Sequence, residues 1–223
     1  MTLFKQNDGS PSNLLAFFNT LTNFILFNML WLGGSLLIVT IPAVTAALFA
    51  SVAPWARGQS ADAPLVTFWT AVRRYWRKAT VLGVIDLLLG GLIGLNLFFI
   101  WQNGFDSSIA LPAFIITSLF GLFLIVANVY LWPLLVTLDP PLRSWLKNGL
   151  RLSVAHLFWG IWVAMMAMTP LAVSVFLPRV TFLILTFAAA ALLTYWGAWR
   201  VMKRYLDAED FQALGLELKA GEI

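Results

Sequence analysis

The feature that most constrains this chain is a run of 48 residues, from Gly9 to Ala56, without one charged side chain. As a single helix, residues 14–52 would extend roughly 58 Å, whereas the hydrocarbon core of a bilayer is about 30 Å thick. Only 11% of the 223 residues are charged and 61% are hydrophobic, while soluble domains carry about 25% charged residues. The sequence therefore predicts a membrane protein with several spans, whose exterior is largely covered by lipid.

Pro42 divides this apolar run, because proline lacks the backbone N–H and kinks a helix or begins a new one. We expect a first span near 18–39 and then a short helix near 42–55, which at about 21 Å is short for a full crossing. The alternative is an interfacial helix ending near Phe27, followed by one span kinked at Pro42. Both interpretations stay open, and so does the side of the membrane on which the N-terminus lies.

The remaining sequence alternates apolar spans with basic amphipathic segments. We expect an all-α membrane protein, with about five transmembrane helices in a single domain at 14–199 between a polar lead-in at 1–13 and a tail at 200–223. The remaining expected segments are interfacial helices at 65–78 and 142–151 and spans near 79–101, 113–136, 152–171 and 181–199.

The segments at 65–78 and 142–151 each place aromatic and aliphatic side chains on one helical face and basic side chains on the other. This pattern is typical of helices that lie in the membrane interface, where basic groups meet anionic lipid headgroups. The basic residues expected at the membrane surface are Arg73, Arg74, Arg77, Lys78, Arg143, Lys147 and Arg151.

The distribution of basic residues also predicts the orientation. Residues 57–78 contain five basic side chains and residues 138–151 contain three, whereas the loop at 102–112 contains none. Cytoplasmic loops carry the excess of lysine and arginine. We therefore expect both basic loops and the C-terminal tail to be cytoplasmic.

A weak internal repeat accompanies this pattern. A basic amphipathic helix followed by a two-span hairpin occurs at 65–136 and again at 142–199, with Trp69 aligned to Trp145. Residue identity between the halves is slight, so duplication is a hypothesis.

Asp86 is the strongest single candidate for a functional residue, because it lies about 12 Å beyond Lys78 along the predicted helix. A carboxylate that faces lipid there costs about 2.5 kcal/mol or more, so it must face the bundle, be protonated or pair. His156, the single histidine, lies at a similar depth past Arg151 and is a candidate partner. The pair would form a proton or substrate contact inside the bundle, or a purely structural interhelical bond.

Three asparagines, Asn28, Asn96 and Asn128, are expected within spans or at their edges, where amides join helices. The chain has no cysteine, and one intramembrane acid with one histidine cannot supply a metal triad. The sequence shows no phosphate-binding loop, Ser-His-Asp arrangement or HExxH motif. We therefore expect no catalysis, no cofactor and no nucleic-acid partner.

Several stretches in a fixed order carry a resemblance to a known family: NMLWLGGSLLIVT at 28–40, PAVTAALF at 42–49, TFWTAVRRYWRKAT at 67–80, YLWPLL at 130–135 and LKNGLRLSVAH at 146–156. Together they resemble the YesL-like family, bacterial membrane proteins whose domain has no assigned function. The resemblance covers nearly the whole chain. One departure is Leu37, where the family usually has a proline before the Ile-Val-Thr stretch.

The resemblance implies an accessory role at the bacterial cell membrane, since such proteins often accompany carbohydrate uptake systems, including ABC-type sugar importers. The first hypothesis is therefore an accessory or scaffold protein that works through a membrane partner such as a sugar importer. The alternative is a small transporter that uses Asp86 and His156 inside its own bundle. An intramembrane enzyme has no supporting motif.

Overall fold

The computed structural model describes residues 13–59, 63–105, 107–176 and 179–206, together with Asp210 and Leu214. Within these ranges the chain is built from α-helices joined by short turns, with no strand, so the all-α fold class predicted from the sequence is confirmed. The elements are α1 (Asn13–Ser35), η1 (a 3-10 turn, Ile38–Thr40), α2 (Ile41–Ala56), α3 (Pro64–Asn103), α4 (Ala110–Leu138), α5 (Leu142–Ala155), α6 (Leu157–Phe176) and α7 (Arg179–Met202).

In the described residues, four segments are long and apolar enough to cross a membrane: Ile38–Ala56, Pro64–Asn103, Ala110–Leu138 and Leu157–Ser174. The structure therefore supports a membrane protein with several spanning helices. The predicted spans near 18–39 and 181–199 correspond to α1 and α7, which are not among the four. The lead-in and most of the tail lie outside the described residues.

The chain turns between α1 and α2, and does not continue as one kinked helix. It leaves α1 at Ser35, passes through η1 and begins α2 at Ile41, with Pro42 in the first turn of α2. The Thr40 hydroxyl donates to the carbonyl of Leu37 at 2.7 Å and also to that of Gly34. The interpretation as one Pro-kinked span is therefore wrong, because the turn closes its own hydrogen bonds before the proline.

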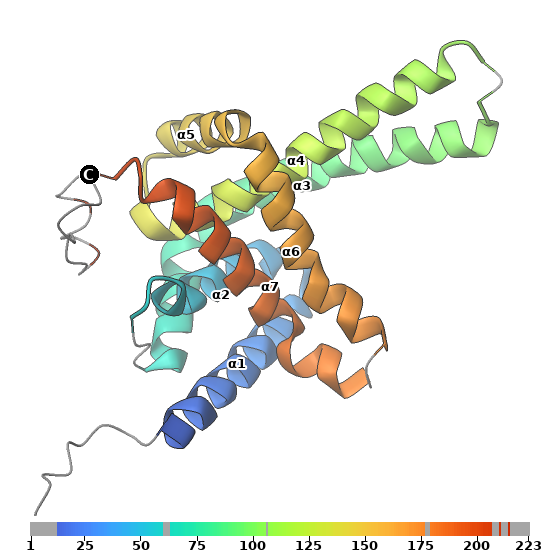
Figure 1. Ribbon diagram of the computed structural model, residues 1–223. Coiled ribbons are helices and arrows are strands. Elements are labelled where there is room, and N and C mark those ends of the chain that lie inside the picture. The colour runs from blue at the N-terminus through green and yellow to red at the C-terminus, as the bar shows by residue number, and fades with distance from the viewer. Residues whose placement is uncertain are drawn as a thin grey trace, which may run out of the picture.

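The short helix predicted after Pro42 is the central element of the fold. α2 packs against α1, α3, α4 and α7 (Figure 1). Its buried surface is rich in small residues, including Ala46, Ala47, Ser51 and Ala53, which let neighbouring helices approach closely. At the contact with α3, a Cβ on Gly83 would lie 2.8 Å from Cβ of Pro42, so this crossing requires a glycine.

The interfacial helix predicted at 65–78 and the span predicted at 79–101 form one uninterrupted helix, α3, of 40 residues. The boundary placed between Lys78 and Ala79 is wrong. Residues 65–82 contain no proline or glycine, and the buried stripe continues across the junction through Tyr75, Ala79 and Leu82.

The second amphipathic helix does end before its span, but four residues later than predicted. α5 extends to Ala155, and His156 breaks the helix with φ −124° and ψ 38°. The buried face of α5 continues past the predicted end at Arg151, through Trp145, Gly149 and Ser153.

The two halves of the suspected repeat differ at the aligned tryptophans. Trp69 is 54% exposed, whereas Trp145 is fully buried and its indole N–H donates to the Leu131 carbonyl at 2.8 Å. The aromatic residue buried at this point of α3 is instead its neighbour, Phe68. Any repeat therefore matches Trp145 to Phe68, one position from the alignment suggested by the sequence.

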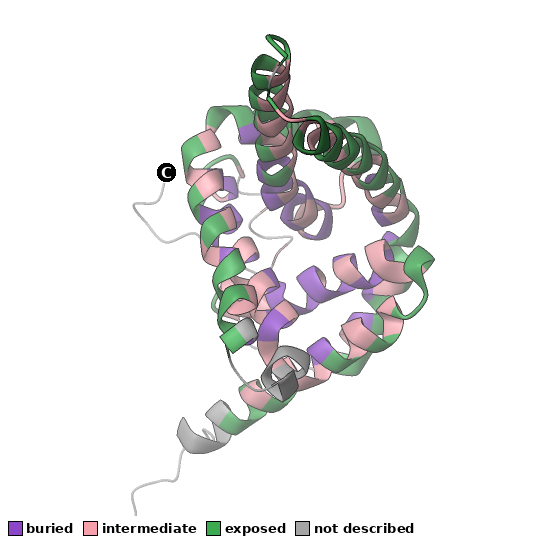
Figure 2. Ribbon diagram, turned by 90° about the vertical axis from the view of Figure 1, so that its right-hand side faces the viewer, coloured by how far each residue is buried: buried purple, intermediate pink, exposed green. Residues whose placement is uncertain are grey.

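Two helical hairpins, α3–α4 and α6–α7, diverge from the centre of the fold (Figure 1). The tip of the α3–α4 hairpin projects beyond the other helices, and its outer half is mostly exposed (Figure 2). Among the large apolar side chains exposed there are Leu87, Leu92, Trp101, Ile109, Ile116 and Phe120. This apolar arm requires lipid or another protein to cover it.

Candidate functional site

The structure joins Asp86 of α3 to Asn128 of α4 at the base of the projecting hairpin. Nδ2 of Asn128 donates to Oδ1 of Asp86 at 2.9 Å and to the Leu124 carbonyl at 3.0 Å. Since both of these groups accept hydrogen bonds, the amide nitrogen must face them. Oδ1 of Asn128 is then buried with no hydrogen-bond partner among the described residues. Leaving such a group unpaired costs about 1–3 kcal/mol.

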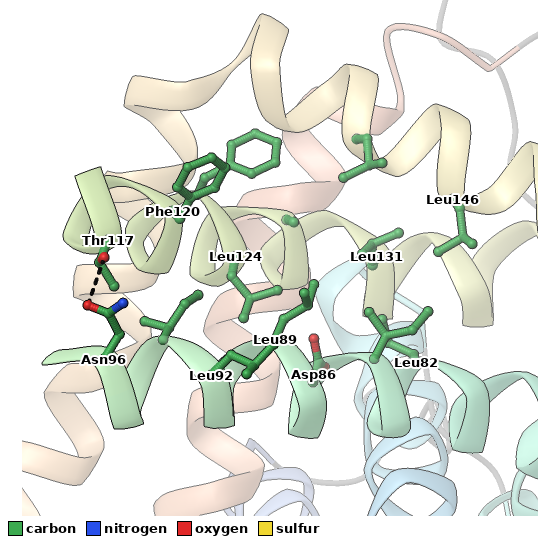
Figure 3. Close-up of a pocket in the computed structure, with 15 residues that line it drawn as sticks. Leu82, Asp86, Leu89, Leu92, Asn96, Thr117, Phe120, Leu124, Leu131 and Leu146 are labelled. Carbon is green, nitrogen blue, oxygen red and sulfur yellow. Dashed lines mark hydrogen bonds between the residues drawn. The ribbon is translucent and has the colours of Figure 1, made fainter. Parts of the chain in front are cut away.

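Asp86 also lines two cavities, which lie on different sides of the hairpin. The larger, of about 580 Å³, lies between α3, α4 and α5 (Figure 3). The smaller, of about 380 Å³, is lined by Asp86 and Asn128 together with residues of α4 and α6 that include Trp132, Ala164 and Met168. The unpaired amide oxygen belongs to a residue in the wall of this smaller cavity.

The residues that line the larger cavity follow the pattern of a coiled-coil seam. On α3 they include positions 82, 86, 89, 93 and 96, and on α4 positions 117, 120, 124, 127 and 131, with steps of three and four. A second polar pair lies further along this seam, where the Thr117 hydroxyl and Oδ1 of Asn96 are 3.4 Å apart (Figure 3). Polar residues at seam positions specify the register of two helices.

The pair suggested between Asp86 and His156 is not formed. Nε2 of His156 lies 2.8 Å from the hydroxyl of Tyr205, and the His156 carbonyl accepts a hydrogen bond from Tyr130 at 3.1 Å. The physical reason is the break between α5 and α6. His156 occupies that break, and its ring turns towards the segment after α7 while Asp86 bonds to Asn128.

Asn28 joins the first helix to the last one. It is fully buried, and its Oδ1 accepts hydrogen bonds from the backbone N–H groups of Phe187 and Ala188, each at 3.0 Å. Like Asn96 and Asn128, it connects two helices, which is the role expected for amides inside a membrane protein.

Two of the basic residues expected to face lipid headgroups bind protein groups instead. Nζ of Lys78 lies 2.6 Å from Oδ1 of Asp139 and also donates to the carbonyls of Asp139 and Pro140. Nε of Arg74 lies 3.0 Å from Oδ2 of the same carboxylate. The other five expected basic residues form no ion pair within the described part of the chain: Arg73, Arg77, Arg143, Lys147 and Arg151.

Sequence reasoning missed Asp139 and a polar cluster beside it. Asp139 follows α4 with a left-handed φ of 45°, and the signal was its position before two prolines at the basic end of a span. In the cluster, Nη1 of Arg57 donates to the Tyr195 hydroxyl at 3.3 Å, and this hydroxyl lies 2.7 Å from Oγ1 of Thr137. No sequence signal connects Arg57 to Tyr195, which is 138 positions away.

No group of three or more His, Cys, Asp or Glu side chains that could hold a metal ion occurs in the described ranges. The polar residues of the α3–α4 hairpin form hydrogen bonds between helices, and the one acceptor among them without a partner in the described residues, Oδ1 of Asn128, is buried.

The family described as "Protein of unknown function, DUF624" matches residues 24–97. The chain is also 34% identical over 167 residues to "Uncharacterized protein YteU" from Bacillus subtilis (strain 168). The aligned region covers 74% of this chain and 73% of that relative. The chain belongs to this family. The recognition of a YesL-like membrane protein from its motifs is thereby confirmed. No solved structure matches the chain.

Proposed function

We propose that this chain is an accessory membrane protein that performs no reaction itself and acts by binding a second membrane protein through the α3–α4 hairpin. The observation that carries the proposal is Oδ1 of Asn128, a buried acceptor without a donor among the described residues. Asn128 stands in the wall of the smaller cavity, beside a hairpin whose outer half has no cover from the described chain.

Lipid alone does not satisfy both features. Acyl chains cover apolar side chains such as Leu87 and Ile125, but they offer no hydrogen-bond donor to Asn128. A hydroxyl, amide or basic side chain of a neighbouring transmembrane helix does, once the Asn128 side chain turns its buried amide oxygen towards that donor. Such interhelical bonds contribute about 0.6 kcal/mol on average and up to about 1.7 kcal/mol.

The opposite wall of the same cavity favours a helix as the occupant. Ala164 and Ala167 of α6 line it, and small residues at helix interfaces allow close backbone approach. A partner helix seated here would lie between the two hairpins, with its donor directed at Asn128.

The association with carbohydrate uptake rests on the YesL-like resemblance alone. We extend the proposal to a partner such as an ABC-type sugar importer in the bacterial cell membrane, with the basic segments and the C-terminal tail on the cytoplasmic side. The excess of basic residues in these segments supports that orientation.

Affinity purification of the full chain from native membranes in mild detergent tests the proposal. We expect a membrane protein to co-purify in near-stoichiometric amount. Asn128→Leu should lose it, whereas Asn96→Leu, at a residue that does not line the smaller cavity, should retain it. A chain that purifies alone as a monodisperse species would contradict the accessory role. If a partner is found that has no part in sugar import, only the carbohydrate assignment fails.

The alternative of a small transporter has less support, because Asp86 and His156 hydrogen-bond to different groups. It predicts substrate flux in proteoliposomes that contain this chain alone. Flux that Asp86→Asn abolishes would favour the transporter over the accessory protein.

A further inference from the structure

The larger cavity differs from the smaller one in shape and in its surroundings. Its lining residues extend from Leu82 to Asn96 along α3, a length of about 21 Å at 1.5 Å per residue. This exceeds one leaflet of a hydrocarbon core about 30 Å thick. Apart from Asp86, Asn96 and Thr117, the lining is apolar. The cavity is therefore a long apolar groove suited to a single extended hydrocarbon chain.

One end of this groove is formed by the amphipathic helix α5. Leu146 of α5 lies with Leu82 and Leu131 at the end opposite the Asn96–Thr117 pair (Figure 3), and Leu150 of α5 also belongs to the lining. The groove thus has a distinct α5 end and a distinct far end along the hairpin.

A row of basic side chains on α5 flanks that end. Arg143 lies three positions before Leu146 and Lys147 follows it directly, whereas Arg151 lines a different cavity, between α4, α5 and the segment after α7. All three are exposed, and none forms an ion pair within the part of the chain that the structure describes. The α5 end of the groove is therefore cationic, whereas the groove itself is apolar.

We propose that this groove binds one anionic phospholipid, with an acyl chain between α3, α4 and α5 and the phosphate group against Arg143 and Lys147. The positive charge of the basic residues on α5 selects the headgroup, and Leu146 and Leu150 of the same helix contact the acyl chain. Asp86 lies one helical turn beyond Leu82, so the acid of the lining stands near the end where the polar ester groups of the lipid lie. The site shares Asp86 and Leu124 with the partner cavity, and its other lining residues are different.

Native mass spectrometry of the full chain tests this site, after purification and equilibration with equimolar phosphatidylglycerol and phosphatidylcholine. We expect about one phosphatidylglycerol to be retained per chain. Each basic residue near a membrane surface favours anionic lipid by about 1 kcal/mol, so each charge removed lowers the preference about fivefold. Arg143→Gln with Lys147→Gln should therefore reduce it about 25-fold, whereas Arg73→Gln with Arg77→Gln on α3 should leave it unchanged.

A second pair of variants tests the groove itself. Leu150→Trp fills the α5 end and should expel the lipid, whereas Val154→Trp, one turn further along α5 and outside the lining, should retain it. Equal retention of phosphatidylcholine, or retention of neither lipid by the unmodified chain, would overturn the proposal. A disulfide or crosslink formed through position 150 to another protein would show a protein occupant and would overturn it equally.

Discussion

Asp86 and Asn128 are 42 positions apart in the chain, and one hydrogen bond of 2.9 Å joins them across the α3–α4 hairpin. The bond uses the amide nitrogen and leaves the amide oxygen without a partner among the described residues. One residue pair therefore serves two purposes. It fixes where α3 crosses α4, and it leaves a buried amide oxygen without a partner on a residue that lines the smaller cavity.

The first prediction concerns this pair. Asp86→Leu removes the acceptor of the Asn128 amide and should lower the free energy of unfolding by about 1 kcal/mol, within the range for interhelical bonds in membranes. Asp86→Asn keeps an acceptor and should lose less than half of that. Unfolding of the reconstituted protein by a denaturing detergent measures both changes. If Asp86→Leu and the unmodified chain are equally stable, the hydrogen bond between Asp86 and Asn128 does not stabilise the fold.

The second prediction concerns close packing of α3 on α2. A Cβ on Gly83 would approach Cβ of Pro42 to 2.8 Å, whereas a Cβ on Gly94 meets nothing within 4 Å. Gly83→Ala should therefore lower thermal stability by about 1–3 kcal/mol, the cost of overpacking. Gly94→Ala should be neutral or stabilising by up to about 1 kcal/mol, because alanine is the better helix former. A thermal melt in detergent that ranks the two variants the other way would show that α2 and α3 do not cross at Gly83.

The third prediction concerns the buried hydroxyl of Tyr195. It bonds to Thr137 and Arg57 and is fully buried. Tyr195→Phe should cost about 1–3 kcal/mol, since it leaves buried polar groups without their partner. Tyr205→Phe removes the contact with His156 at a side chain that is 62% exposed, and should change stability by less than about 0.5 kcal/mol. Both are measured by the same detergent unfolding assay, and equal effects would argue against a structural role for the Tyr195 cluster.

The fourth prediction concerns the carboxylate that holds Lys78 and Arg74. Asparagine tolerates the left-handed backbone at position 139, so Asp139→Asn removes the charge and keeps the conformation. Exposed ion pairs contribute about 0.2–1 kcal/mol each, and we expect a loss of that order for the two pairs together. The difference between the variant and the unmodified chain should shrink in 1 M salt, because salt screens exposed charges. A difference that does not depend on salt would show that the carboxylate acts through hydrogen bonds alone.

Much of the fold follows from patterns within single segments. The position of Pro42 predicted a helix at 42–55, close to α2 at Ile41–Ala56. The apolar run at 113–136 likewise predicted most of α4, which extends from Ala110 to Leu138. Such patterns are local, since a proline or an uncharged run acts on the helix that contains it.

What the sequence could not supply is the set of contacts between segments. The acidity of Asp86 and its depth marked it as a candidate, but its partner, Asn128, was named only as one of three asparagines. Depth along a helix does not give the direction of a side chain around that helix. For this reason His156 was a plausible partner by depth, although the break at the end of α5 turns it towards Tyr205.

The measurement that tests the central claim most directly is disulfide or photo-crosslinking in native membranes. The chain has no cysteine, so single cysteines can be placed without altering the background. Ile125→Cys lies in the smaller cavity beside Asn128, whereas Phe158→Cys is an exposed control on α6 that lines neither cavity. We predict that a photoactivated label at position 125 crosslinks to one defined membrane protein, that position 158 does not, and that Asn128→Leu weakens the crosslink. If the label at position 125 reacts only with lipid, both in the chain that keeps Asn128 and in the Asn128→Leu variant, the result would contradict a protein partner at this site.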